Sequence, residues 1–105
     1  MSSASIYKTI RQTVQANLPD CRIVLFGSRA RGDNDYYSDY DLLIITASTF
    51  TPKENIRWST LLNHAIVKAL KIPVDILINS ESEVSEKLEL PGHIIRTAIK
   101  EGISL

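Results

Sequence analysis

Cysteine is almost absent from this sequence, which contains Cys21 alone among 105 residues. A single cysteine cannot form a disulfide within the chain, and it cannot build a cysteine-based zinc site. The amino terminus lacks a basic segment followed by an apolar run, so a secretory signal is not expected. Apolar runs are also short, whereas a membrane-spanning helix needs about 20 apolar residues. We therefore expect a soluble protein of the cytoplasm.

An excess of either charge is also missing, because 12 Lys and Arg residues balance 12 Asp and Glu residues. Strong non-specific binding to nucleic acids or anionic membranes needs a basic excess, so we expect neither a membrane partner nor direct nucleic-acid binding. Hydrophobic residues make up 44% of the chain and charged residues 23%, as in ordinary globular proteins. The length is below the roughly 150 residues that give one domain, and residues 1–105 are expected to form a single domain.

Hydrophobic periodicity predicts a small α/β domain with a mixed sheet flanked by helices. Apolar residues recur every fourth position in a first helix that ends near residue 18, and a dense apolar run follows as a strand. The expected order is helix, strand, strand, helix, strand, helix, helix, with strands at 21–26, 39–45 and 74–78 and later helices at 52–71, 80–88 and 94–102.

Two capping boxes mark the starts of expected helices. Thr51 and Glu54 form one, with Pro52 at the first helical position, and Ser80 and Glu83 form the other. The helix after Thr51 is expected to present one apolar face to the core, made of Trp58, Leu61, Leu62, Ala65, Ile66, Ala69 and Leu70.

Three carboxylates lie where expected strands begin or run. Asp39 and Asp41 are two residues apart, so on a strand their side chains point to the same face. Asp75 lies in an apolar strand, where an unpaired charge is costly. Carboxylate oxygens without a thiolate pair favour a hard cation such as Mg²⁺. We predict a three-carboxylate metal site, although each aspartate alone is more typical of a turn or a cap.

The dipeptide Gly27-Ser28 ends the first expected strand and precedes a short helical turn. Glycine lets a phosphate approach the backbone, and the start of a helix offers free N–H groups at a positive dipole end. Taken alone, Gly27-Ser28 is a tight turn. A phosphate cradle facing a carboxylate-bound metal is nevertheless what phosphoryl or nucleotidyl transfer requires.

The motif from Gly27 to Gly32, followed by Asp39-Tyr40-Asp41 with ten residues between Ser28 and Asp39, resembles the signature of the DNA-polymerase-beta-type nucleotidyltransferases. More narrowly, it resembles minimal nucleotidyltransferase (MNT) domains, the MntA-like antitoxins of HEPN/MNT pairs. The Pro73–Leu77 segment is similar to the strand that carries the third carboxylate of that family, and the resemblance continues to the carboxyl end of the chain.

This resemblance implies a palm-like fold and specific roles for five residues. Gly27 and Ser28 would hold the phosphates of ATP, while Asp39 and Asp41 would bind two Mg²⁺ ions. Asp75 would join this metal site and help to activate the attacking hydroxyl. The implied reaction is transfer of AMP from ATP, with loss of pyrophosphate, to a tyrosine of a HEPN toxin partner, which is an antitoxin role.

Several alternatives remain at this stage. The acceptor hydroxyl belongs either to a protein or to a small molecule such as an aminoglycoside, and an antitoxin that acts by binding alone is a third function. Arg29 and Arg31 either steady the triphosphate or lie in a solvated turn. A domain this small leaves one side of the site open, so we expect a partner or a second copy of the chain to cover it.

Overall fold

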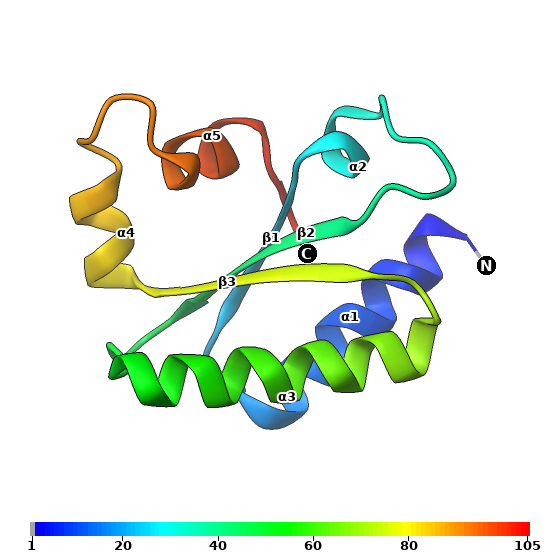
Figure 1. Ribbon diagram of the computed structural model, residues 1–105, viewed down its shortest axis with the longest axis horizontal. Helices are drawn as coiled ribbons and strands as arrows, with labels where there is room; N and C mark the ends of the chain where they lie inside the picture. Colours follow the sequence, from blue (N-terminus) through cyan, green and yellow to red (C-terminus); the bar gives the residue numbers. More distant parts are fainter. Residues whose placement is uncertain (1) are drawn as a thin grey trace.

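The computed structural model describes residues 2–105 and has three layers, with a central sheet between two layers of helices (Figure 1). The elements are α1 (Ser3–Asn17), β1 (Arg22–Phe26), α2 (Ser28–Arg31), β2 (Tyr40–Thr46), α3 (Pro52–Leu70), β3 (Val74–Ser80), α4 (Glu81–Lys87), α5 (Ile94–Glu101) and β4 (Ile103–Ser104). The expected α/β class is confirmed.

The sheet is mixed, with strand order β3-β2-β1-β4. β1 is antiparallel to both β2 and β4, whereas β2 and β3 are parallel and are connected through α3. Because β2 and β3 run in the same direction, their first residues lie at the same edge of the sheet. The last residues of β1 meet that edge too, since Phe26 is in register with Asp41.

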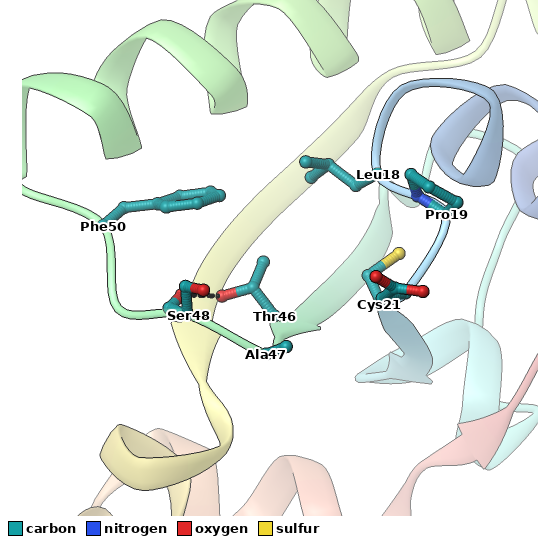
Figure 2. A pocket seen from close by; sticks show the side chains of 8 residues that line it. Leu18, Pro19, Cys21, Thr46, Ala47, Ser48 and Phe50 are labelled. Atoms are coloured by element: carbon teal, nitrogen blue, oxygen red, sulfur yellow. Dashed lines mark hydrogen bonds between the residues drawn. The ribbon is translucent and has the colours of Figure 1, made fainter.

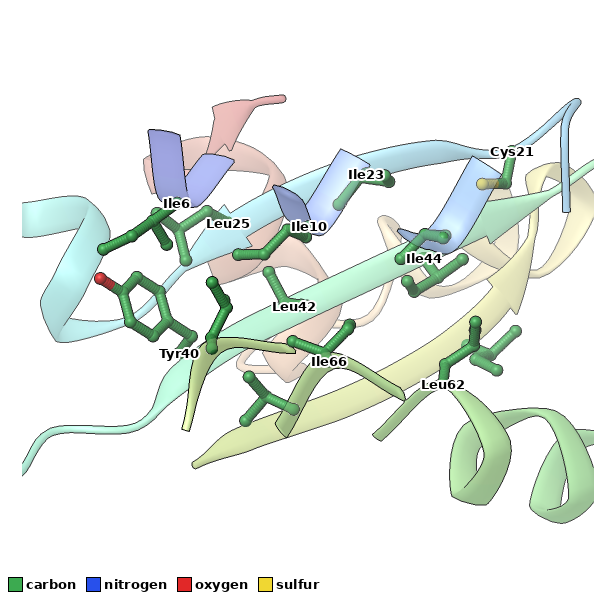
Figure 3. Close-up of a cluster of buried hydrophobic side chains, with 14 residues drawn as sticks. Ile6, Ile10, Cys21, Ile23, Leu25, Tyr40, Leu42, Ile44, Leu62 and Ile66 are labelled. Carbon is green, nitrogen blue, oxygen red and sulfur yellow. The ribbon is translucent and has the colours of Figure 1, made fainter. Parts of the chain in front are cut away.

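Side chains along the central strands point alternately to the two faces of the sheet, and this divides the core into two parts. On one face, Leu42 and Ile44 pack with α1 and α3 (Figure 3). On the other face, Leu43 and Ile45 pack with α4 and α5. Strands covered on both faces carry continuous apolar runs, which explains the dense hydrophobic sequence of β1 and β2.

Both predicted capping boxes are present. Thr51 accepts a hydrogen bond from the Glu54 amide at 3.1 Å, and Ser80 accepts one from the Glu83 amide at 3.1 Å. The predicted apolar face of α3 was too wide. Leu62, Ile66 and Leu70 are its buried residues, whereas Leu61 is 43% exposed. Ala69 is exposed as well. The sheet covers only the narrow i, i+4 stripe of this helix.

Most boundaries differ from the sequence expectation by one or two residues, and two differences change the description of the sheet. β2 begins at Tyr40, so Asp39 immediately precedes the strand instead of opening it. Beyond α5 the chain forms β4, which pairs with Val24 and Leu25 of β1 and was not predicted. A two-residue strand has too little sequence pattern to be recognised, and its pairing partner lies far away along the chain.

Among residues 2–105, no helix combines the length and apolar character that crossing a membrane requires.

Candidate active site

Asp41 and Asp75 lie side by side near the beginnings of the two parallel strands. They are in register, Asp41 as the second residue of β2 and Asp75 as the second residue of β3. Partners in register on neighbouring strands point to the same face of a sheet. That face is the one that Leu43 and Leu77 share farther along with α4 and α5. The sheet therefore brings together two carboxylates that are 34 positions apart in the sequence.

Asp41 is half-buried, and Asp39 and Asp75 are exposed. Burial raises the pKa of Asp41 above its ordinary value, and the charges of Asp75 and Asp39 raise it further. The nearby charge of Arg31 acts in the opposite direction. The Asp41 carboxylate therefore lies where added negative charge is disfavoured and a cation is favoured.

Gly27 brings the backbone directly against the Asp41 side chain. Its φ of 74° and ψ of −158° define a conformation that is open almost only to glycine. A Cβ atom at this position would collide with Oδ2 of Asp41 and lie 3.1 Å from its Cγ. The sequence therefore needs glycine here for two reasons, the conformation and the close approach.

The short helix α2 begins immediately beside this contact, with Gly27 as its N-cap. The carbonyl of Gly27 accepts hydrogen bonds from the amides of Ala30 and Arg31, both at 3.1 Å. The amides of Ser28 and Arg29 precede the first intrahelical bonds and, as a glycine, the N-cap carries no side chain to bond them. Two backbone donors thus follow directly after the glycine that touches Asp41, an arrangement suited to phosphate oxygens.

Arg31 forms exposed ion pairs with Asp33, at 3.1 Å, and with Glu101 at the end of α5, at 3.3 Å. Sequence reasoning missed Glu101. No local pattern could have revealed it, because 70 positions separate it from Arg31. Arg29 instead points toward the segment that precedes β2, where its Nε and Nη2 atoms donate to the carbonyl of Ser38.

The residues at this edge fit Mg²⁺. They offer carboxylate oxygens only, and Mg²⁺ completes its shell with water and substrate phosphates rather than with a full protein cage. Among residues 2–105, however, no three His, Cys, Asp or Glu side chains are grouped so that they could hold an ion, so the three predicted carboxylates do not form a complete metal site on their own. Asp41, with Asp39 and Asp75 around it, would supply the protein ligands.

A separate small pocket lies at the opposite end of β1 and β2, lined by Leu18, Pro19, Asp20, Cys21, Thr46, Ala47, Ser48 and Phe50 (Figure 2). It has none of the predicted site residues. Cys21 in its wall is buried, and burial raises the pKa of its thiol. This is the behaviour of a small core residue, and the residues that line the pocket include no basic side chain for charged phosphates.

Comparison with known proteins identifies the family and the fold of this chain. Residues 7–105 match the nucleotidyltransferase domain family. No curated protein matches the chain in sequence. The fold is similar to that of a chain in the crystal structure of a toxin–antitoxin complex with AMP-PNP, with a TM-score of 0.64 and 21% identity over 92% of this chain and 69% of that one.

A second similar structure is that of a tri-AMPylated HEPN toxin from Shewanella oneidensis in complex with an MNT antitoxin. Its TM-score is 0.66, with 18% identity over 98% of this chain and 71% of the matched one. A protein assigned to the minimal nucleotidyltransferases has a TM-score of 0.62 and 20% identity, over all of this chain and 97% of its own. At these identities the structures establish a shared fold, and the family match covers nearly the whole sequence. The chain belongs to the nucleotidyltransferase domain family.

Proposed function

We propose that this nucleotidyltransferase transfers AMP from ATP to a tyrosine hydroxyl of a HEPN-type partner, with Mg²⁺ as its cofactor, and thereby acts as an antitoxin. One observation carries the proposal: Asp41 and Asp75 stand in register beside the backbone of Gly27, where a phosphate cradle begins. The similarity in fold to chains of toxin–antitoxin complexes, one with a tri-AMPylated HEPN toxin, supports this choice of acceptor.

In this proposal each residue has one task. The amides of Ser28 and Arg29 bind phosphate oxygens of ATP, and Gly27 leaves room for them. Asp39 and Asp41 would hold Mg²⁺, and the bound metal would neutralise phosphate charge and stabilise the attacking and leaving oxygens. Asp75 orients the acceptor hydroxyl and takes part in removing its proton.

The transfer forms one bond and breaks one. The acceptor oxygen bonds to the α-phosphorus, and the bond from that phosphorus to the bridging oxygen breaks. Pyrophosphate leaves with the electron pair of the broken bond, while the proton of the hydroxyl passes to Asp75 and then to solvent. The exposed position of Asp75 in the edge strand lets an acceptor approach from outside the sheet.

Label transfer tests this function. ATP labelled at its α-phosphate is incubated with the protein, Mg²⁺ and an extract of the organism that encodes the chain, and labelled proteins are separated and sequenced. We expect one labelled HEPN-type protein carrying AMP on tyrosine. Asp39→Asn and Asp41→Asn should each reduce labelling by at least about a hundredfold, as is usual when a metal ligand or charged catalytic group is lost.

Asp20→Asn is the matched control, because Asp20 is an exposed aspartate at the opposite end of the sheet. It should label at the wild-type rate. Labelling that persists in Asp41→Asn would contradict the proposal. Release of pyrophosphate with hydroxylated small molecules but not with protein would assign the acceptor to that class, and inhibition of a toxin without any transfer would indicate an antitoxin that works by binding.

A further inference from the structure

Arg29 contacts the segment that leads into β2 at several points. Its Nε and Nη2 atoms donate to the carbonyl of Ser38 at 3.2 and 3.0 Å, and Nη2 also reaches the carbonyl of Tyr36 at 3.4 Å. The centre of the guanidinium lies 4.5 Å from the centroid of the Tyr40 ring. One side chain of α2 thus binds residues 36, 38 and 40.

These contacts involve the residues immediately before and after Asp39. Ser38, which precedes it, has its carbonyl held by the guanidinium, and Tyr40, which follows it, has its ring beneath the same group. The amide of Tyr40 also donates to the carbonyl of Pro73 at 3.1 Å, just before β3. Asp39 itself is exposed and precedes the strand, so the sheet ladder does not fix it. Its position depends on the two neighbours that Arg29 holds.

The guanidinium lies on the side of the sheet away from the phosphate cradle. Tyr40 belongs to the core beneath α1 and α3, together with Leu42 and Ile6 (Figure 3). Asp41, the next residue, points to the opposite face. A groove on the Tyr40 side includes Arg29, Tyr36 and Tyr37 in its lining but none of the three aspartates. The side chain of Arg29 is therefore directed away from any triphosphate bound at Gly27 and Ser28.

We infer that Arg29 is a positioning residue that joins the phosphate cradle to the metal carboxylates, by fixing the segment 36–38 and thereby the place of Asp39. The inference rests on the proposed function for its consequence in catalysis. The backbone amide of Arg29 belongs to the phosphate cradle, and the side chain of Arg29 determines the position of Asp39. A forked guanidinium suits this task, because it donates two bonds to one carbonyl while it lies over an aromatic ring.

The test compares Arg29→Met, Arg29→Lys and the control Arg11→Met, which removes an exposed arginine from α1. Three quantities are measured: hydrogen exchange of individual backbone amides, binding of Mn²⁺ alone, and the kcat and KM of AMP transfer. Thermal melting verifies that each variant is folded. Mn²⁺ serves as the probe because its paramagnetism reports free and bound metal directly.

In Arg29→Met we expect the amides of Ser38 and Tyr40 to exchange about tenfold faster, as the loss of a charge-assisted bond predicts, with Leu43 and Ile44 unchanged. Mn²⁺ affinity should fall by a similar factor, and kcat should fall more than the KM for ATP rises. Arg29→Lys keeps the positive charge but lacks the forked guanidinium. Its amide exchange, Mn²⁺ affinity and kcat should therefore lie between those of Arg29→Met and those of the wild type. Arg11→Met should match the wild type.

Unchanged exchange at Ser38 and Tyr40 in both Arg29 variants would overturn the inference. A higher KM for ATP with unchanged exchange and Mn²⁺ binding would also overturn it, since Arg29 would then be a direct phosphate ligand. If the wild-type protein transfers no AMP, the proposed function fails, yet the exchange and Mn²⁺ measurements still decide the role of Arg29.

Discussion

At the scale of single residues, Gly27 shows how one position serves both the fold and the site. Its backbone occupies a region that costs other residues about 1–3 kcal/mol, and its missing side chain is what lets Asp41 lie against the chain. Gly32 ends the same helix with a φ of 83°, but a Cβ there would meet nothing within 4 Å. Gly27 is therefore required both for its backbone conformation and for the close contact with Asp41, whereas Gly32 is required for its conformation alone.

Gly27→Ala should lower the free energy of unfolding by about 2–3 kcal/mol and abolish nucleotide transfer, because the new methyl group displaces the Asp41 carboxylate. Gly32→Ala should lower it by only about 1 kcal/mol and leave transfer measurable. Urea unfolding and the label-transfer assay measure both effects. Equal losses of activity in the two variants would show that the contact with Asp41 is unimportant.

At the scale of elements, β3 is an edge strand whose outer side is partly closed by α3. Asn63 donates to the carbonyl of Val74 at 2.7 Å, and Asn55 donates to the carbonyl of Ile78 at 2.9 Å. These bonds occupy carbonyls that a further strand would otherwise use. They also fix α3 against the strand that carries Asp75, one residue after Val74.

Asn63→Ala should lower the free energy of unfolding by about 1 kcal/mol, the usual value of one hydrogen bond, and the double variant with Asn55→Ala should self-associate through the opened edge. Urea unfolding and light scattering over a range of concentrations measure these outcomes. Asn17→Ala is the control, because Asn17 bonds only to the carbonyl of Thr13 within its own helix. A double variant no more associated than this control would contradict the protective role.

At the scale of the whole molecule, the repulsion among the carboxylates of the site reduces the stability of the folded protein. Burial and two neighbouring carboxylates raise the pKa of Asp41, so the folded protein binds this proton more tightly than the unfolded chain does. The contribution of Asp41 to stability therefore decreases as the pH rises through its pKa. A bound cation would reverse this effect, because it binds the charged form in the native state.

Without divalent metal, Asp41→Asn should raise the free energy of unfolding at neutral pH by up to about 1 kcal/mol, a modest value because solvent screens these partly exposed charges. The difference should disappear as the pH falls through the pKa of Asp41, where the wild-type side chain is also neutral. Added Mg²⁺ should stabilise the wild type but not the variant. Urea titrations at several pH values, with Asp20→Asn as control, test this; a less stable variant at neutral pH would refute it.

Much of the fold was predictable because its signals are local. Capping at Thr51 and Ser80 and the apolar runs of β1 and β2 depend on residues a few positions apart. The start of β2 at Tyr40 and the strand β4 were not predictable, since pairing with distant segments defines both. The apolar face predicted for α3 was wider than its buried face for the same reason, because the neighbouring sheet decides how much of a helix is covered.

The candidate site was likewise predictable only in part. The sequence by itself determined which residue types are present and their spacing: a glycine and serine after a strand, two aspartates after ten intervening residues, and a third in a distant strand. Tertiary structure alone decided that Asp41 and Asp75 stand in register, that Gly27 touches Asp41, and that Arg29 contacts the residues before and after Asp39. The physical reason is that conformational preferences act over a few residues, whereas charge repulsion, burial and hydrogen bonding act between whichever residues the folded chain brings together.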